Sequence, residues 1–386
     1  MMKKIQLIFI QVLAFVTVFA DEPSIKPSIQ PYLNMQFWNS YSEGIEVNGV
    51  SAPSRAVSYF RRGRAGLKGK FTEQISFDLV VNFDYLGKDP NLSSKGKVNT
   101  GDFSIWSAYA TWQALPKSQW LMITGGTFLP HMSRESVTSP WTTSSLDKGE
   151  TSCYLRQFAT GKTNGICPGI NIGGLGAVGK NQLLYNVAYV NRQDATSIMT
   201  QKWSPVVLGH VIYNIGDKEW SSYKYTLSGN SLKKQKLLSL GLGFSNQGAT
   251  DVFKSSATYG ADFLFCRNGL KLDGEYYFLK RENSEDYLAT CLQLRASYNI
   301  FLKNGWILEP AFMFNRFDGD DSFKDASYYD GKDQLLDSGV NLISGKKKMK
   351  ISLHYIDRSS GGTKNYRITS SGTYGSYLNL GLQLMI

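Results

Sequence analysis

The sequence predicts an all-β protein, a transmembrane antiparallel β-barrel of about sixteen strands. Three observations predict it. Apolar and polar residues alternate along many segments, aromatic residues make up 13% of the chain, and short turns alternate with long polar loops. A chain of 386 residues is long enough for one large barrel.

The amino terminus predicts export. Two lysines near the start are followed by an almost wholly apolar stretch, residues 5–19, and a small residue precedes Asp21. This pattern is typical of a signal peptide. We therefore expect residues 1–20 to be removed and residues 21–386 to form a single barrel domain. A retained helical anchor is the alternative, but the apolar stretch is short for a helix that spans a membrane.

Alternation with a period of two is clearest in residues 74–85. The odd-numbered positions are apolar or aromatic, whereas most even-numbered positions are polar. A strand with one apolar face separates these two sets, and a helix does not. The same pattern recurs along the chain and gives an even number of strands, as single-chain bacterial barrels have. The predicted strands cover residues 31–41, 56–70, 74–85, 102–114, 119–130, 168–178, 183–192, 203–215, 235–245, 256–266, 270–281, 287–301, 305–316, 333–343, 347–357 and 375–386.

The connections between these strands are short and long in turn. Long polar stretches lie near residues 86–101, 131–168, 193–202, 246–255, 318–332 and 358–373. In outer-membrane barrels the short turns face the periplasm and the long loops lie outside the cell. A soluble β-sandwich or a propeller would also alternate, but it would not span so many residues per strand, and no blade-length repeat is present.

Residues 219–228 also look like a strand. Counting them would make the number of strands odd and would put the next long loop on the wrong side. We interpret them as an insertion on the periplasmic side. For residues 219–234, a plug, a periplasmic extension and a further strand all remain open.

The densest basic segment begins at Tyr59. In a strand, Arg62, Arg64, Lys68 and Lys70 share one face. A basic side chain on the lipid face of a barrel costs about 2–4 kcal/mol at mid-depth, so we predict that this face lines the lumen. Such a column favours anions that shed water in a narrow pore, and arginine adds paired hydrogen bonds to phosphate or carboxylate oxygens.

Charge balancing is the alternative interpretation of this column. The next strand carries Asp78 and Asp84 on its polar face. If Lys70 lies opposite Gln74 across the short turn, Asp78 lies opposite Gly66 and diagonal to two of the basic residues. We nevertheless favour attraction of anions, because the basic residues of the column outnumber these two acids.

The longest loop, residues 131–168, predicts a second set of basic residues in the pore. A long loop that folds into a barrel narrows it, and Arg134 and Arg156 are the candidate constriction residues. A solvated extracellular loop is the alternative. The loop also holds Cys153 and Cys167, for which we predict a disulfide in an oxidising compartment. The other two cysteines lie in strand patterns and are interpreted as small strand residues.

A further basic face, Lys348, Lys350 and His354, lies near the carboxyl end. Its two lysines lie near a short turn, which predicts a solvated rim. No enzyme motif occurs, and the sequence predicts neither a cofactor nor a metal site. A hydrolase that uses His354 with Ser352 is conceivable, but two residues on one strand face more often simply line a lumen.

Four segments resemble the phosphate-selective porin O and P family. They are residues 60–70 (FRRGRAGLKGK), 125–139 (GGTFLPHMSRESVTS), 339–350 (GVNLISGKKKMK) and 380–384 (LGLQL). The resemblance implies a sixteen-stranded trimeric barrel whose pore is lined by arginine and lysine and favours anions. By this resemblance Arg62, Arg64, Lys68 and Arg134 line the path.

The sequence thus predicts an outer-membrane porin for passive diffusion of small hydrophilic solutes, with a preference for anions such as phosphate. We expect small anions and outer-membrane lipid as its partners and no binding of nucleic acid, and the resemblance implies a homotrimer. The runner-up is a structural or adhesive barrel with a blocked lumen and no transport. The predicted pore-lining or anion-binding residues are Arg62, Arg64, Lys68, Lys70, Arg134 and Arg156.

Overall fold

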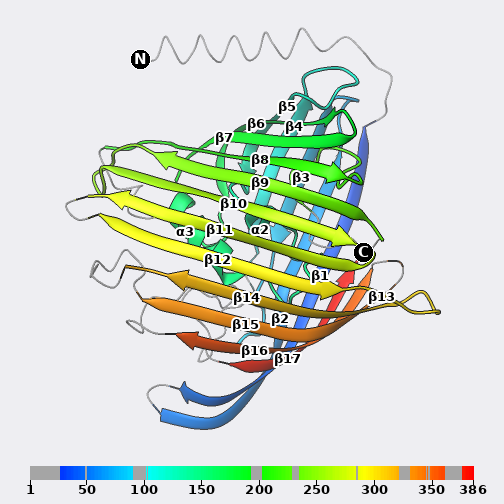
Figure 1. The fold of residues 1–386 in the computed structure, drawn as a ribbon, viewed down its shortest axis with the longest axis vertical. Helices are drawn as coiled ribbons and strands as arrows, with labels where there is room; N and C mark the ends of the chain where they lie inside the picture. The colour runs from blue at the N-terminus through cyan, green and yellow to red at the C-terminus, as the bar shows by residue number, and fades with distance from the viewer. Residues whose placement is uncertain are drawn as a thin grey trace.

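The computed structural model describes residues 27–47, 50–89, 101, 103–192, 202–227, 234–283, 286–320, 331–344, 346, 348–360 and 376–386. These residues form one closed antiparallel barrel (Figure 1). Its sheet has 17 labelled strands. Because β12 and β13 both pair with β14, they occupy one place in the wall, so the barrel has 16 strand positions. The predicted signal peptide lies outside the described residues.

Each strand pairs with the next along the chain, and β1 pairs with β17 to close the barrel. The sixteen predicted strands are confirmed, with ends that differ by a few residues. The strands are β1 (Ser28–Val47), β2 (Val50–Lys70), β3 (Ile75–Asn82), β4 (Ser104–Gln113), β5 (Met122–Phe128), β6 (Cys167–Val178), β7 (Asn181–Val190), β8 (Val206–Gly216), β9 (Lys236–Gln247), β10 (Ser255–Arg267), β11 (Leu270–Glu282), β12 (Tyr287–Tyr298), β13 (Ile300–Phe301), β14 (Ile307–Asp318), β15 (Lys332–Ile343), β16 (Met349–Ser360) and β17 (Tyr377–Met385).

The first hairpin is longer than predicted. No strand is predicted between residues 41 and 56, but β1 and β2 stay paired as far as Val47 and Val50. In Figure 1 this hairpin projects beyond the rest of the barrel. Backbone pairing needs no apolar face outside the membrane, which is why the alternation pattern missed this part.

The two faces of the wall differ as the alternation predicted. In β9 the side chains of Leu240, Leu242 and Phe244 are exposed on the outer surface, whereas Ser239 and Ser245 are buried on the inner side. Apolar side chains therefore face lipid, and polar side chains face the lumen. Among the described residues, no helix has the length and apolar character needed to cross a membrane.

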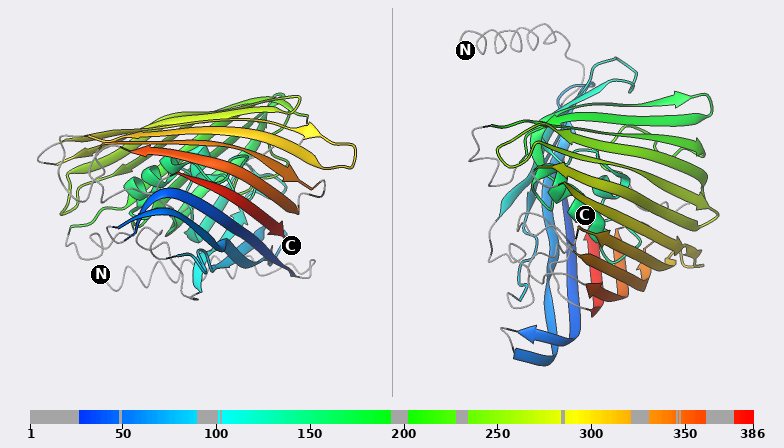
Figure 2. Two further views of the ribbon diagram at one scale, coloured as in Figure 1. Left: turned by 90° about the horizontal axis from the view of Figure 1, so that it is seen from below. Right: turned by 60° about the vertical axis from the view of Figure 1, so that its left-hand side comes forward.

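The long loop between β5 and β6 folds into the barrel and carries two helices, α2 (Arg134–Val137) and α3 (Glu150–Thr160). Figure 2 shows both helices inside the ring of strands. Helix α3 packs on the wall through Tyr154, whose ring stacks on Phe317 with 4.0 Å between the ring centroids. The helix ends at Gly161, whose φ of 82° lies in the left-handed region that glycine adopts easily.

The segment between β8 and β9 also folds inward. It leaves the barrel at the end that carries the short turns, and Trp220, Tyr225 and Leu227 are buried. Leu227 forms an isolated parallel bridge with Thr138 of the long loop. The described part of this segment, residues 217–227, is thus a plug-like insertion and not a further strand of the barrel.

Candidate anion path through the barrel

The inner face of the wall from β10 to β15 is rich in carboxylates, and the long loop docks against it. The Arg134 backbone N–H donates to Asp262 Oδ2 (3.3 Å), and the Leu146 N–H donates to Asp337 Oδ2 (2.7 Å). The Tyr154 hydroxyl donates to Asp333 Oδ2 (2.8 Å). This wall therefore holds the loop in place, and many of its acids are occupied by the loop.

Arg62 lies on the inner face of β2. The register between β1 and β2 shifts at Gln36, so Arg61 and Arg62 both reach the inner side. Both arginines form ion pairs with Asp147 of the long loop, at 2.6 Å from Arg61 and 2.5 Å from Arg62. Burial alone would raise the pKa of Asp147, but the two guanidinium groups hold it below its usual value.

Arg64, two residues along the same face, is also paired. Its Nη2 lies 3.1 Å from Asp84 Oδ2, and its guanidinium carbon lies 3.5 Å from the centre of the Trp106 ring. Most of its charge is therefore balanced by the wall itself.

Lys68 and Lys70 are exposed near the turn end of β2. The predicted register here was wrong by two residues, because Asp78 lies directly opposite Lys68 and not opposite Gly66. Lys70 pairs with Ser76 and not with Gln74, so the connection between these two partners is two residues longer than predicted. An acid thus lies opposite the third basic residue of the column.

Two buried cations of the long loop donate to backbone carbonyls, and the Glu135 carboxylate also acts on the charge of Lys148. Lys148 Nζ donates to the Ser136 carbonyl (2.7 Å), and Arg156 Nε donates to the Ser152 carbonyl (3.0 Å). Within the described part of the chain, neither side chain forms an ion pair with an acid. Burial, and next the charge of Arg156, lowers the pKa of Lys148 well below its usual value.

Lys350 joins these cations, contrary to the prediction that it lies on a solvated rim. It is buried on the inner face of β16, and its Nζ donates to the Thr143 carbonyl of the long loop (3.0 Å). The inward loop covers it, which a strand pattern alone does not reveal. Lys348 is exposed, as predicted.

We call Arg62, Lys148, Arg156 and Lys350 the basic cluster. Arg62 lies close enough to both lysines for its charge to repel theirs, and Lys148 and Arg156 repel each other in the same way. Sequence reasoning selected Arg62 and Arg156 but missed both lysines. The alternation of the sequence places Lys350 on the same strand face as His354. Lys148 lies in an irregular loop, where no alternation predicts which way a side chain points.

Arg134 is fixed between the two inward segments. Its Nη1 and Nη2 donate to the two carboxylate oxygens of Glu219 at 2.7 and 3.2 Å, and its Nε lies 3.4 Å from Asp262 Oδ1. The guanidinium therefore joins α2 to the β8–β9 segment and to the wall. With two carboxylates beside it, Arg134 offers little net charge to a passing anion.

The β8–β9 segment makes further contacts with the lumen wall. Tyr223 donates to Asn186 Oδ1 (2.6 Å), and Trp220 exchanges two hydrogen bonds with Gln182 (2.8 and 3.2 Å). Leu227 pairs with the long loop through backbone hydrogen bonds to Val137 and Ser139. The two inward segments thus narrow the same part of the lumen.

The three histidines are buried in this network. His210 Nε2 lies 2.6 Å from Asp262 Oδ2, and burial, followed by the charge of His210, lowers the pKa of His131 to about 3. His354 contacts Asp337 (2.5 Å) and Asn341 (3.1 Å). Ser352 also donates to Asn341 (2.7 Å), so the structure does not pair His354 with Ser352 as a hydrolase would need.

The predicted disulfide between Cys153 and Cys167 is not formed, and all four cysteines are buried free thiols. Arg156 Nη2 donates to Cys153 Sγ (3.2 Å), and Cys167 Sγ donates to the Gly165 carbonyl (3.6 Å). Helix α3 and the start of β6 place the two thiols in one apolar cluster without bonding them. Cys266 and Cys291 lie within strands, as predicted, and both are buried.

Comparisons with solved structures reveal outer-membrane channels of the same fold. An anion-selective porin from Comamonas acidovorans matches with a TM-score of 0.62 and 14% identity, over 94% of this chain and all of that one. The OmpF porin of Salmonella typhi, in a complex with daunomycin, gives 0.60 and 12% over 93% and 97%. The DcaP channel of Acinetobacter baumannii gives 0.55 and 13% over 95% and 99%.

No curated protein matches the chain. The model of the phosphate-selective porin O and P family matches residues 33–386, which is nearly the whole described barrel. Together with the closed barrel, the lipid-facing outer surface and the inward loop, this match identifies a channel of the outer membrane. The chain belongs to the phosphate-selective porin O and P family and is an outer-membrane porin.

Proposed function

We propose that this porin passes small hydrophilic anions, phosphate among them, along a path lined by the basic cluster. The observation that carries the proposal is the pair Lys148 and Arg156, two buried cations of the inward loop that form no ion pair with an acid among the described residues. Phosphate is the ion that the family name indicates.

The physical reason is the cost of desolvating charge. A buried cation without a counter-ion is unfavourable, and an anion that comes close offsets this cost for both. The charge of Arg156 also acts against that of Lys148, and Glu135 offsets part of this repulsion. An anion beside Lys148 also raises its pKa again, so the ammonium form returns when the site is occupied.

The predicted site residues take different roles in this proposal. Arg62 and Arg156 contact the passing anion together with Lys148 and Lys350. Lys68 and Lys70 are exposed at the turn end and attract anions to the periplasmic mouth. Arg64 and Arg134 are paired with Asp84 and Glu219, so they shape the path more than they attract anions.

A barrel with a blocked lumen remains a second candidate, and one observation favours it. The long loop and the β8–β9 segment both enter the lumen and are joined by the ion pair between Arg134 and Glu219. A structural barrel of this kind would insert into a bilayer without carrying current, so conductance separates the two candidates.

Three features beyond the channel itself are also proposed. Residues 1–20 are removed on export, because they have the pattern of a signal peptide. The barrel forms a homotrimer in outer-membrane lipid, as the family resemblance implies, and crosslinking of the purified protein tests this. The protein acts as a passive channel without a catalytic step.

The test is the reversal potential of single channels in a planar bilayer under a KCl gradient. We expect the sign that favours chloride, and we expect Lys148→Gln/Arg156→Gln to bring it close to zero. Lys303→Gln, which removes an exposed cation of a short turn, is the matched control and should leave it unchanged. A folded barrel that carries no current would overturn the proposal in favour of the blocked lumen. Equal chloride preference in all variants would show that the basic cluster does not determine the anion selectivity.

A further inference from the structure

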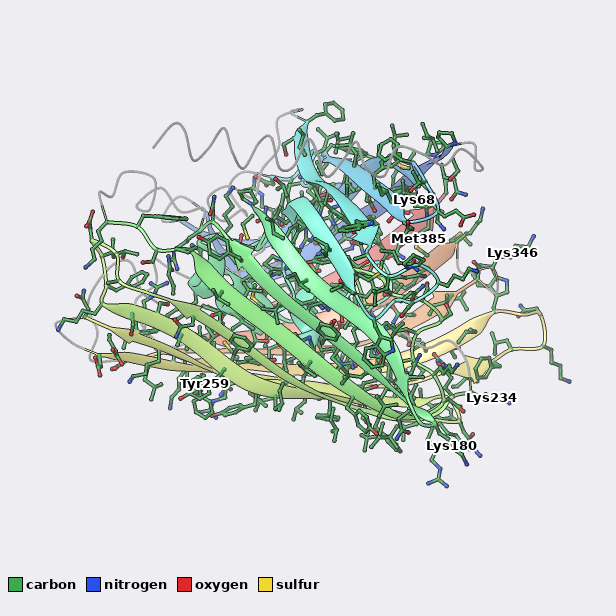
Figure 3. The ribbon with its side chains drawn as sticks, turned by 90° about the horizontal axis from the view of Figure 1, so that it is seen from above. Lys68, Lys180, Lys234, Tyr259, Lys346 and Met385 are labelled. Carbon is green, nitrogen blue, oxygen red and sulfur yellow. The ribbon has the colours of Figure 1, made fainter. Side chains whose placement is uncertain are left out.

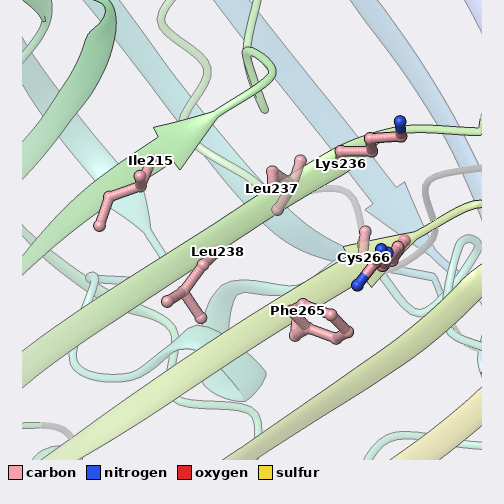
Figure 4. A pocket seen from close by; sticks show the side chains of 7 residues that line it. Ile215, Lys236, Leu237, Leu238, Phe265 and Cys266 are labelled. Carbon is pink, nitrogen blue, oxygen red and sulfur yellow. The ribbon is translucent and has the colours of Figure 1, made fainter.

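A shallow depression of about 280 Å³ lies on the outer face of the barrel, at the turn end of β8, β9 and β10 (Figure 4). Ile215, Leu238 and Phe265 belong to the lipid-facing side of their strands, so the depression opens toward the membrane. Leu237 and Cys266, which are buried and pack with Leu264, complete its lining. It is therefore distinct from the anion path.

Two cations flank this depression. Lys236 and Arg267 lie directly opposite each other in the register of β9 and β10, and both side chains are exposed. Like charges in such a cross-strand pair repel each other. In the described ranges neither side chain has an ion pair, and the carboxylate of Asp217 accepts a hydrogen bond from the backbone N–H of Lys236 (2.8 Å). The pair thus lacks a full counter-charge.

The floor of the depression is apolar and continuous across three strands. Leu238 lies opposite Ile215 on one side and opposite Phe265 on the other. Ile215 is 40% exposed although it is a large apolar residue. This row lies next to the two cations on their membrane side, and Leu240 and Phe263, the next outward-facing pair of β9 and β10, continue the apolar surface. Such a surface fits an acyl chain attached to an anionic head group.

The depression lies at the level of lipid head groups. Exposed aromatic residues such as Tyr298 and Phe301 lie at the same end of the barrel, and such aromatic girdles mark the membrane interface. Lys234, two residues before Lys236 in the chain, has its Nζ 5.4 Å from the centre of the Phe301 ring. In Figure 3, Lys68, Lys180, Lys234 and Lys346 all lie toward this end, which makes the rim cationic.

We propose that this depression binds an anionic phospholipid of the periplasmic leaflet. The phosphate lies between Lys236 and Arg267, where the guanidinium can donate two parallel hydrogen bonds to its oxygens. One acyl chain lies along Ile215, Leu238 and Phe265. The bound lipid relieves the repulsion between the two cations and seals β9 and β10 against the leaflet beside the β8–β9 segment.

Native mass spectrometry of the detergent-solubilised, folded barrel tests this proposal. The protein is titrated with phosphatidylglycerol and, separately, with phosphatidylcholine of the same acyl chains. We expect Lys236→Gln/Arg267→Gln to weaken binding of the first phosphatidylglycerol by about thirtyfold, since two basic residues near a surface together contribute on the order of 2 kcal/mol. Lys236→Arg keeps the charge and should keep the binding.

The control removes two cations from the same rim but away from the depression. In Lys117→Asn/Lys348→Gln, asparagine suits the positive φ of 61° at residue 117, and Lys348 is an exposed cation near the start of β16. This variant should bind phosphatidylglycerol as the unchanged protein does, and excess inorganic phosphate should not displace the lipid. If both double variants lose phosphatidylglycerol binding to the same extent, the general positive charge of the rim would explain the binding, and the proposal would be overturned. Equal binding of the two lipids, or displacement by inorganic phosphate, would overturn it as well.

Discussion

Arg134 and Glu219 join two segments that enter the lumen from opposite ends of the barrel. The two guanidinium nitrogens lie 2.7 and 3.2 Å from the two carboxylate oxygens, and both side chains are buried. The long loop between β5 and β6 begins on the side of the long connections, whereas the β8–β9 segment begins on the side of the short turns. One buried ion pair therefore joins the two segments inside the lumen.

Breaking this pair should loosen the channel. In Glu219→Ala, Arg134 keeps Asp262 but loses its link to the β8–β9 segment. Removing one partner of a buried pair costs about 3–5 kcal/mol, so we expect lower thermal stability together with larger and noisier single-channel currents. Lys218→Ala, at an exposed neighbouring position, is the control and should behave like the unchanged protein. Quiet, unchanged currents in Glu219→Ala would show that the pair does not restrain the segment.

Asp147→Asn should change selectivity and stability in opposite directions. Asp147 balances Arg61 and Arg62, so its neutralisation leaves more positive charge beside the basic cluster. We expect a stronger preference for chloride in the reversal potential. We also expect a loss of about 3–5 kcal/mol of stability, because two buried arginines lose their counter-ion. Heat-dependent mobility on gels measures the second effect, and a weaker chloride preference would contradict the first.

Anion preference should fall as the pH rises. Lys148 is charged below its own pKa and neutral above it, and burial and Arg156 place that pKa well below the usual lysine value. The decline should therefore occur at a pH lower than about 10.4, where an ordinary lysine loses its proton. In Lys148→Arg the decline should disappear, since arginine keeps its charge. An identical pH profile in that variant would exclude Lys148 as the titrating group.

Two substitutions of Tyr154 separate its ring from its hydroxyl. Tyr154→Phe loses the hydrogen bond to Asp333, worth about 1 kcal/mol, but keeps the stack on Phe317. Tyr154→Ala loses both and should cost about 3–5 kcal/mol and release α3 from the wall. We expect a larger conductance in Tyr154→Ala and a nearly unchanged one in Tyr154→Phe. Equal conductances would mean that α3 stays docked without the ring.

The four cysteines should all react with an alkylating reagent after denaturation without reductant. Intact mass spectrometry then counts the added groups. If two added groups are missing and appear only after reduction, the result would support the predicted disulfide between Cys153 and Cys167.

The wall of the barrel was predictable from the sequence because each strand carries its own signal. Alternation in β9 or β16 depends on residues that are neighbours in the chain, and the lipid face imposes it at every second position. The same parity places Lys350 and His354 on one face. The basic residues of β2 and the long loop were found from strand parity and loop length, and the resemblance to the family implied their place along the pore.

The interior was less predictable because it depends on contacts between distant segments. Arg64 meets Asp84 within one hairpin, but Asp147 reaches Arg62 from a loop 85 residues away in the chain. No local pattern announces that Glu219 pairs with Arg134. Burial of Lys350 likewise follows from a loop that covers it, so a rim position was the natural prediction and was wrong.

The most direct test of the anion path is block of the chloride current by added phosphate, measured on single channels. If phosphate passes the basic cluster, it should reduce the current at sub-millimolar concentration, where screening of charge is slight. In Lys148→Gln/Arg156→Gln the block should require at least about tenfold more phosphate, which corresponds to roughly 1.4 kcal/mol. The same block in both proteins would contradict the account, because phosphate would then bind elsewhere in the channel.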